Sequence, residues 1–325
     1  MRWIVLLLTL AATASPQLQA QDGRNPTGRA RQDNGTDAGA PVLSEALAAQ
    51  VMLDRAGFSP GEIDGKPGSN LKRALVAFQS SRNLTPSGAM DEATWQRLQR
   101  DGGNQPPLTN YTITAEDIAG PFTPDIPPDL MEQSKLAALD YRSLPEALGE
   151  RFHANPTLLK TLNPSASFAK AGESLTVPNV SSVTPPSPPP GVTIIVTKAT
   201  SSLTLEDAEH HVIFQAPVTS GSEHDPLPIG QWKVNGVQHN PEFHYNPALF
   251  WDANPAHSKA RLAPGPNNPV GTVWIDISKE HYGIHGTPEP SKIGHVESHG
   301  CVRLTNWDAQ YVAALVKPGA QVIFK

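Results

Sequence analysis

The chain has 325 residues, which is more than one typical domain holds, so its length predicts several modules. The formal net charge is −6 and no basic stripe is present, so we expect no nucleic-acid partner. The only cysteine, Cys301, excludes an internal disulfide and predicts a free thiol. The composition does not indicate an oligomeric state.

Residues 1–20 have the pattern of a secretory signal peptide: Arg2, an apolar run over 3–12, and a small-residue end at Ala20. The apolar core is about ten residues, short of the roughly 20 that span a bilayer, so we expect no stable membrane insertion of the mature chain. An uncleaved, membrane-retained segment is the alternative. No cysteine lies near the end of this segment for lipid attachment, so we expect the protein in the periplasm. A wall-associated location outside a single membrane is the alternative.

Residues 21–40 are Gly, Asn, Asp and Arg with few large apolar side chains, which predicts a flexible tether. Over residues 41–100 the apolar residues recur at helical spacing, as in Leu71, Ala74, Leu75 and Phe78, and predict three short helices. We expect Ser69 or Asn70 to cap the second helix and Asp91 the third.

The order GFSPGEIDGKPG, ALVAFQ and LTPSGAMDEATWQRL in this region resembles the three-helix peptidoglycan-binding module of cell-wall enzymes. The resemblance implies that residues 41–100 bind glycan strands of the wall. A small helical domain with an unknown partner is the alternative. Residues 101–138 are rich in Pro, Gly, Asn and Asp, and predict an extended connector with at most one short strand.

Residues 139–180 predict two helices and a closing strand over 174–177. The segment resembles a LysM module, which implies binding to N-acetylglucosamine chains, and the matching pieces are Asn163-Pro164 and Gly172. The opening strand and the Gly-Asp-Thr of that family are missing, and residues 140–143 stand in their place. A structural spacer is therefore the alternative. Residues 181–191 contain TPPSPPPG and predict a stiff linker.

Residues 192–325 contain short β-rich runs separated by Pro and Gly, and predict a mainly-β domain of about 130 residues. The runs are VTIIV, SLTL, HVIFQAPVTSG, QWKVNG, GTVWIDI, YGIHG and QVIF. One helix is expected after Thr305, which has the carboxylate of Asp308 three residues later in capping-box form.

The segment HGTPEPSKIGHVESHGCVRL places His285 sixteen positions before Cys301. An imidazole beside a thiol can take its proton and hold the thiolate as an ion pair, which allows acyl transfer. Gly300 gives the backbone next to Cys301 the freedom to turn its amides toward an oxyanion, so these amides are candidates for an oxyanion hole. An ordinary turn glycine is the alternative for Gly300.

These motifs resemble the L,D-transpeptidases of the YkuD type, which carry HGT, a spacer, and SHGC followed by a β-branched residue and Arg. The resemblance spans residues 192–325 and implies a β-sandwich fold. By this resemblance, Cys301 is the nucleophile and His285 the general base, oriented by a carbonyl near Gly286. Three more residues would line the substrate site: Ser298, His299 and Arg303. A solvated or structural Arg303 is the alternative to one that pairs with a substrate carboxylate.

The resemblance implies a reaction on peptidoglycan stem peptides. Cys301 would attack the carbonyl between a diamino acid and D-Ala, release D-Ala, and pass the acyl group to a second stem amine to form a cross-link. We expect neither a metal nor a cofactor. Water as acceptor would give an L,D-carboxypeptidase, and the same chemistry would serve a hydrolase of diamino-acid-linked wall lipoprotein.

Two alternative interpretations of the site remain. The crowding of His281, His285, His295, His299 and Cys301 suggests zinc, although no C-x-x-C or H-E-x-x-H spacing is present. A non-catalytic peptidoglycan-binding protein is the rival of another class. For specificity we expect a loop over residues 239–267, whose aromatic residues form either a lid or ordinary packing.

Overall fold

The computed structural model describes residues 43–102, 104–180 and 187–325. The predicted signal peptide and tether lie outside these residues, as does most of the proline-rich linker. In the part of the chain that is described, none of the helices is long and apolar enough to cross a membrane.

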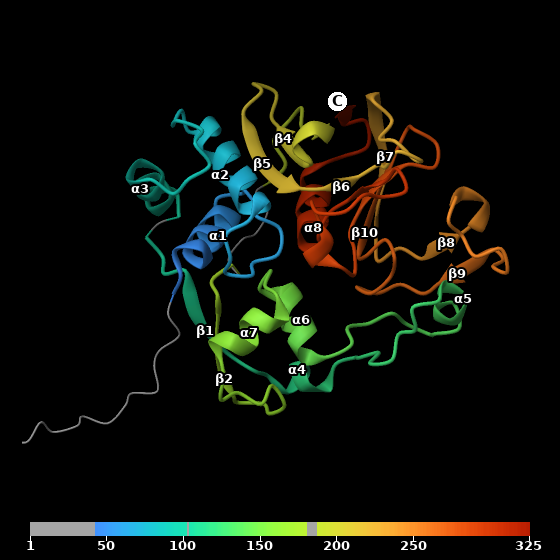
Figure 1. Cartoon of the computed structure of the whole chain (residues 1–325), viewed down its shortest axis with the longest axis horizontal. Helices are drawn as coiled ribbons and strands as arrows, with labels where there is room; N and C mark the ends of the chain where they lie inside the picture. Colours follow the sequence, from blue (N-terminus) through green and yellow to red (C-terminus); the bar gives the residue numbers. More distant parts are fainter. Residues whose placement is uncertain (1–42, 103, 181–186) are drawn as a thin grey trace, which may run out of the picture. The chain divides into compact units, whose positions relative to one another are not determined.

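The first module contains the three predicted helices, α1 (Glu45–Arg55), α2 (Ser69–Ser81) and α3 (Glu92–Asp101) (Figure 1). Asp91 caps α3 through the Thr94 amide, as predicted. The cap prediction for α2 is wrong: its N-cap is Gly68, which has no side chain to accept a hydrogen bond. The Asn70 amide instead donates to Ile293 O, 2.9 Å away in the last domain.

In the middle module, β1 (Leu108–Thr112) pairs antiparallel with β2 (Ser174–Pro178). Four helices lie between them: α4 (Ala115–Ala119), α5 (Leu130–Gln133), α6 (Leu144–Arg151) and α7 (Pro156–Leu162). The two predicted helices and the closing strand are thus present. The predicted connector, residues 101–138, contains β1, and it also contains α4 and α5, which the composition did not predict.

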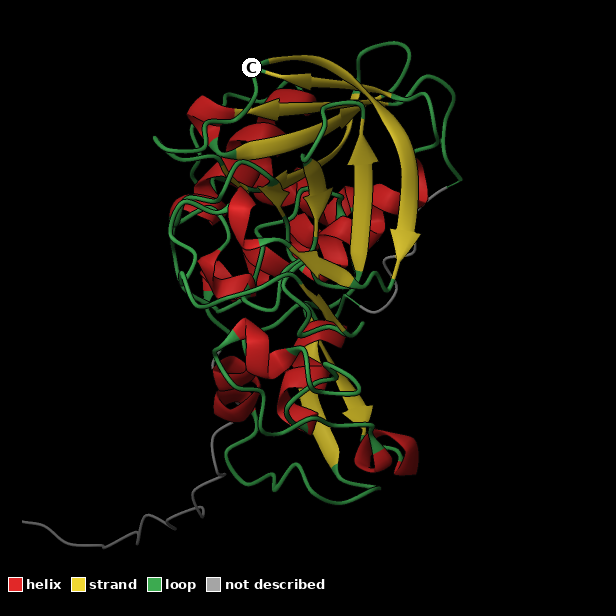
Figure 2. Cartoon of the chain, turned by 90° about the vertical axis from the view of Figure 1, so that its right-hand side faces the viewer, coloured by secondary structure: helices red, strands yellow, loops and turns green. Residues whose placement is uncertain are grey.

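The last domain is built on nine strands and one long helix, α8 (Asn306–Leu315) (Figure 2). The strands are β3 (Thr193–Thr197), β4 (Ser202–Glu206), β5 (Val212–Pro217), β6 (Thr219–Ser220), β7 (Gly230–His239), β10 (Val273–Ile277), β11 (Gly283–His285), β12 (Val302–Arg303) and β13 (Gln321–Phe324). They follow the order β5-β4-β3-β13-β7-β10-β11-β12-β6, with parallel pairing at β3–β13 and β11–β12. All seven predicted β-rich runs form strands.

Strand β7 joins two halves of this sheet. Its first residues pair with β13, and the residues from Val234 onward pair with β10. Side chains from both halves and from α8 share one apolar core that includes Ile194, Leu205, Ile275 and Val312. The mainly-β prediction is confirmed. The two halves of the sheet can enclose one core because β7 pairs with strands of both halves. The Thr305 hydroxyl caps α8 through the Asp308 amide, as predicted.

A hairpin of β8 (Phe243–Tyr245) and β9 (Ala260–Leu262) lies within the expected specificity loop and was not predicted from the sequence. The last domain also contains three short 3-10 helices: η1 (Lys198–Thr200), η2 (Pro247–Leu249) and η3 (Pro290–Lys292). The hairpin packs on the connector around Ile126, Leu139, Tyr245 and Leu262, all of which are buried.

The three modules also touch through polar groups. The Ser59 amide, in the first module, donates to Gln215 O on β5 at 2.8 Å, and its hydroxyl donates to Asp308 on α8 at 3.0 Å. Ile63 forms a β-bridge with Ala154, after α6. The modules are therefore packed together through buried contacts.

Candidate active site

Strand pairing brings the two halves of the motif together. In the parallel pair β11–β12, His285 stands opposite Arg303, and Cys301 comes directly before β12. His285, Cys301 and Arg303 line one cavity of about 890 Å³. Residues sixteen positions apart thus share one surface because β11 and β12 are neighbours.

His285 is buried and has a fixed orientation. Its Nδ1 donates to Gly286 O at 2.7 Å, because a carbonyl only accepts, and this leaves Nε2 without a proton. The Trp274 ring stacks on the imidazole, with ring centroids 5.4 Å apart. Burial, aided by the charge of Arg303, lowers the pKa of His285 to about 3. The imidazole is therefore neutral at physiological pH.

Cys301 is half-buried, and its Sγ lies 3.9 Å from His281 O. Burial raises the pKa of the Cys301 thiol, while the Gly283 amide and the charge of Arg303 partly offset this effect. Together with the low pKa of His285, this shift favours a neutral thiol beside a neutral imidazole. The resting site therefore differs from the ion pair expected from the sequence, because burial disfavours both charges.

Gly300 has a φ of +97°, a conformation that residues with a side chain rarely adopt. A Cβ at this position would lie 2.6 Å from Tyr282 Cε1, so the aromatic ring also requires glycine. The turn places the amides of Gly300 and Cys301 beside the thiol. Among the described residues, no hydrogen-bond acceptor is found for either amide, which leaves both available to an oxyanion.

Gly286 has a second function besides orienting His285. A Cβ on Gly286 would lie 2.2 Å from Asn306 Oδ1. That oxygen accepts from the amides of Thr272 and Thr287, both at 3.1 Å, and so ties the turn after His285 to the start of α8. Asn306 was not predicted from the sequence, although it directly follows the predicted cap residue Thr305.

Ser298 and His299 differ in their surroundings, although they are neighbours in the sequence. The Ser298 hydroxyl is buried, accepts from the Gly221 amide at 2.8 Å and donates to Cys301 O at 2.6 Å. We therefore correct the expectation that Ser298 contacts substrate: both of its bonds hold the loop that carries Cys301. His299 lines the cavity, and its Nε2 lies 2.8 Å from Asp252 Oδ1.

Arg303 borders two cavities, the one that contains Cys301 and a second of about 790 Å³. Within the described residues, its Nε is buried and has no hydrogen-bond partner. Burial lowers the pKa of Arg303, although a guanidinium stays charged at neutral pH. A charged guanidinium at the cavity can bind a carboxylate there.

The hairpin and the connector form the outer wall of the catalytic cavity. Phe243, Tyr245 and Phe250 line it, whereas Trp251 is 60% exposed and stacks on His224. The connector residues Pro128, Asp129 and Leu130 also line it, which the sequence did not indicate.

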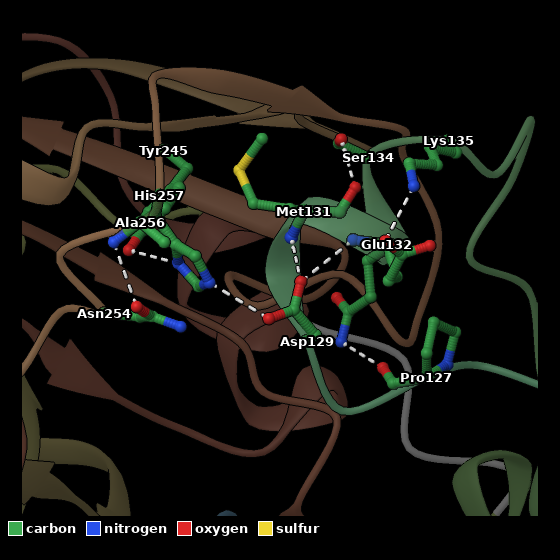
Figure 3. Close-up of polar contacts among 11 residues, drawn as sticks. Pro127, Asp129, Met131, Glu132, Ser134, Lys135, Tyr245, Asn254, Ala256 and His257 are labelled. Atoms are coloured by element: carbon green, nitrogen blue, oxygen red, sulfur yellow. Dashed lines mark hydrogen bonds and ion pairs between the residues drawn. The ribbon is translucent and has the colours of Figure 1, made fainter.

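Figure 3 shows how the hairpin and the connector are joined. His257 Nε2 lies 3.0 Å from Asp129 Oδ2, and His257 Nδ1 lies 3.0 Å from the Tyr245 hydroxyl. The other oxygen of Asp129 caps α5 through the amides of Met131 and Glu132. One imidazole therefore bridges the connector and the hairpin.

Four of the residues that suggested zinc line one cavity, but within the described residues their ligand atoms do not form a group close enough to share an ion. His281 lies 3.5 Å from Glu280, and His295 lies 3.5 Å from the Asn70 amide. In the described part of the chain, the one group of three metal-type side chains close enough to share an ion is elsewhere, at Asp207, Glu209 and His211.

Two segments of the chain match known protein families. Residues 191–324 match the family model described as "L,D-transpeptidase catalytic domain" (YkuD), and residues 44–98 match "Putative peptidoglycan binding domain". The last domain is thus similar to L,D-transpeptidase catalytic domains. In this chain, the segment that matches the YkuD model follows the segment that matches the peptidoglycan-binding model.

Individual relatives cover different shares of the chain. The "Putative L,D-transpeptidase YkuD" of Bacillus subtilis is 28% identical over 57% of this chain and 88% of its own length. The protein of the same name from Bacillus licheniformis is 48% identical, but the match spans only 18% of this chain and 36% of that protein. The solved structure "L,D-transpeptidase from Mycobacterium smegmatis" is 17% identical, with a TM-score of 0.34 over 42% of this chain and 58% of that one.

Proposed function

We propose that the chain is an exported peptidoglycan L,D-transpeptidase that forms cross-links through a Cys301 acyl-enzyme. The observation that carries the proposal is that Cys301 and His285 line one cavity, with His285 Nδ1 bound to Gly286 O so that Nε2 is a free base. The match of residues 191–324 to the YkuD domain supports the same activity.

In the first step, the Cys301 sulfur attacks the carbonyl between the diamino acid and D-Ala while His285 Nε2 takes the thiol proton. Removing the proton during attack fits a site that favours the neutral pair. The amides of Gly300 and Cys301 donate to the oxyanion that forms. The C–N bond then breaks, His285 returns the proton to the leaving amine, and D-Ala departs from a thioester.

In the second step, the side-chain amine of another stem peptide attacks the thioester. His285 takes a proton from this amine, the C–S bond breaks, and the thiolate is protonated again as the cross-link forms. Arg303 is the residue that we assign to a substrate carboxylate, because its charged side chain lines the cavity that contains Cys301. We assign His299 to the same cavity wall, where Asp252 holds its ring.

The other modules direct the enzyme to its substrate. The signal-peptide pattern of residues 1–20 supports export to the periplasm. The peptidoglycan-binding domain would hold glycan strands near the thiol and raise the local substrate concentration. We assign the middle module to the LysM-like class, because β1 and β2 pair around α6 and α7. A purely structural spacer is its alternative.

Incubation of the mature protein and its Cys301→Ala variant with disaccharide tetrapeptides, followed by mass spectrometry, tests the proposal. We expect only the wild type to release D-Ala, to show an acyl adduct and to yield cross-linked dimers. Tripeptide without dimers would indicate an L,D-carboxypeptidase. Release of a diamino-acid-linked lipoprotein peptide, with intact tetrapeptides, would indicate the hydrolase. Neither product nor adduct would favour a non-catalytic binding protein.

A further inference from the structure

A carboxylate from the middle module reaches the catalytic domain close to the site. Glu150 lies on α6, and its Oε1 accepts from Asn306 Nδ2 at 3.1 Å. The two residues are 156 positions apart in the sequence. Glu150 is partly buried, and burial raises the pKa of its carboxyl to about 8. The contact is therefore a partly buried link between modules.

Glu150 is one of the groups that hold the Asn306 amide in one orientation. Asn306 Nδ2 has two acceptors, Glu150 and Pro266 O at 3.2 Å. If the amide turned over, its oxygen would face the Pro266 carbonyl, which only accepts, and its NH2 would face the Thr272 and Thr287 amides, which only donate. With Nδ2 held on this side, Oδ1 faces the Thr272 and Thr287 amides on the other.

The orientation of Asn306 in turn sets the turn that carries His285. Thr287 donates to Asn306 Oδ1, and Gly286 approaches that oxygen so closely that a Cβ would lie 2.2 Å from it. The Gly286 carbonyl between them holds His285 Nδ1. A shift of Asn306 would therefore move the acceptor that fixes the catalytic imidazole.

Three other carboxylates line the same second cavity without this connection. Glu62 accepts from the Asn155 amide at 2.9 Å, Glu146 accepts from the Asn267 amide at 2.8 Å, and Glu289 pairs with Lys292 at 2.6 Å. None of them bonds to Asn306. The position of Glu150 on the network is thus specific within its cavity.

We propose that Glu150 is a positioning residue for the general base His285, acting through Asn306, so that the middle module completes the catalytic site as well as linking the wall-binding domain to it. The inference rests on the proposed function, because it assigns His285 the role of base. By this inference, the packing of the middle module against the catalytic domain directly affects the rate of acyl transfer.

Variants at Glu150 separate the hydrogen bond from the charge and the volume. Glu150→Gln keeps an acceptor for Asn306, whereas Glu150→Asp keeps the carboxyl but is one methylene too short to reach it. Glu150→Ala removes both. Glu62→Ala is the matched control, because it empties the same cavity and leaves Asn306 untouched.

The variants are compared in the full mature chain by kcat and KM on disaccharide tetrapeptides and by thermal unfolding. Glu150→Asp and Glu150→Ala are expected to lose about tenfold or more in kcat with little change in KM, because small displacements of a catalytic group are costly. Glu150→Gln and Glu62→Ala are expected to stay near wild type. Glu150→Gln serves as the rescue if Glu150→Ala does not fold.

A second readout is independent of peptidoglycan: acylation of Cys301 by p-nitrophenyl acetate, measured by the mass of the intact protein. The same order of variants is expected, with His285→Ala as the lower reference. Normal acylation and kcat in a folded Glu150→Asp variant would overturn the inference, and so would an equal loss in Glu62→Ala. If the wild type acylates but releases no D-Ala, the proposed function fails while the acylation rates still decide the role of Glu150.

Discussion

Replacement of Gly300 by alanine combines two costs that the structure separates. The left-handed φ of +97° costs an alanine about 1–2 kcal/mol. Its Cβ would also lie 2.6 Å from Tyr282 Cε1, and such overpacking typically costs about 1–3 kcal/mol more. We therefore expect Gly300→Ala to lower the free energy of unfolding by about 2–5 kcal/mol in total. Because Cys301 is the next residue, kcat should also fall.

Gly319 provides the matched control, because its φ is +89° and nothing lies within 4 Å of its Cβ position. Gly319→Ala should therefore lose only the conformational part, about 1–2 kcal/mol, and keep wild-type kcat. Urea unfolding of the catalytic domain, followed by tryptophan fluorescence, measures the difference. Adding Tyr282→Ala to Gly300→Ala should recover part of the loss. Equal losses at Gly300 and Gly319 would refute the steric reasoning.

Three further predictions concern the site. Alkylation of Cys301 by iodoacetamide should rise about tenfold per pH unit from pH 6 to 8, since the pKa of the thiol is raised; a flat profile would indicate an ion pair with His285 instead. His257→Ala should raise KM with little change in kcat, because it breaks the bridge between Asp129 and the hairpin; an unchanged KM would show that the hairpin needs no such tie. Ser298→Ala should cost about 1–3 kcal/mol in thermal unfolding, because a buried amide loses its acceptor, and a smaller loss would mean that water replaces the hydroxyl.

Much of the catalytic domain was predictable because its signals are local. A β-rich run bounded by Gly and Pro identifies a strand wherever its partner lies, and every predicted run formed one. The same holds for the helices of the first module, and for Asp91, which caps with its own side chain. The α2 cap was mispredicted because the helix begins at Ser69, so both candidates lie inside it, and the Asn70 amide donates to Ile293 O in another module.

Contacts between distant segments were not predictable in this way. The pairing of β1 with β2 crosses four helices, so no window of sequence contains both strands. The hairpin β8–β9 has short strands, and its aromatic residues pack on a connector that composition alone describes as extended. In both cases the tertiary partner, and not the local pattern, determines the structure.

By itself, the sequence determined which residues can perform acyl transfer, because a thiol, an imidazole and flexible glycines have that chemistry in any fold that brings them together. Only the tertiary structure determined the pKa values and the orientations of these groups. Burial shifts the pKa values of His285 and Cys301 in opposite directions, and Asn306 donates a hydrogen bond to Glu150 of another module. Both effects depend on which groups are packed against each other and removed from water, and the order of residues along the chain does not state this.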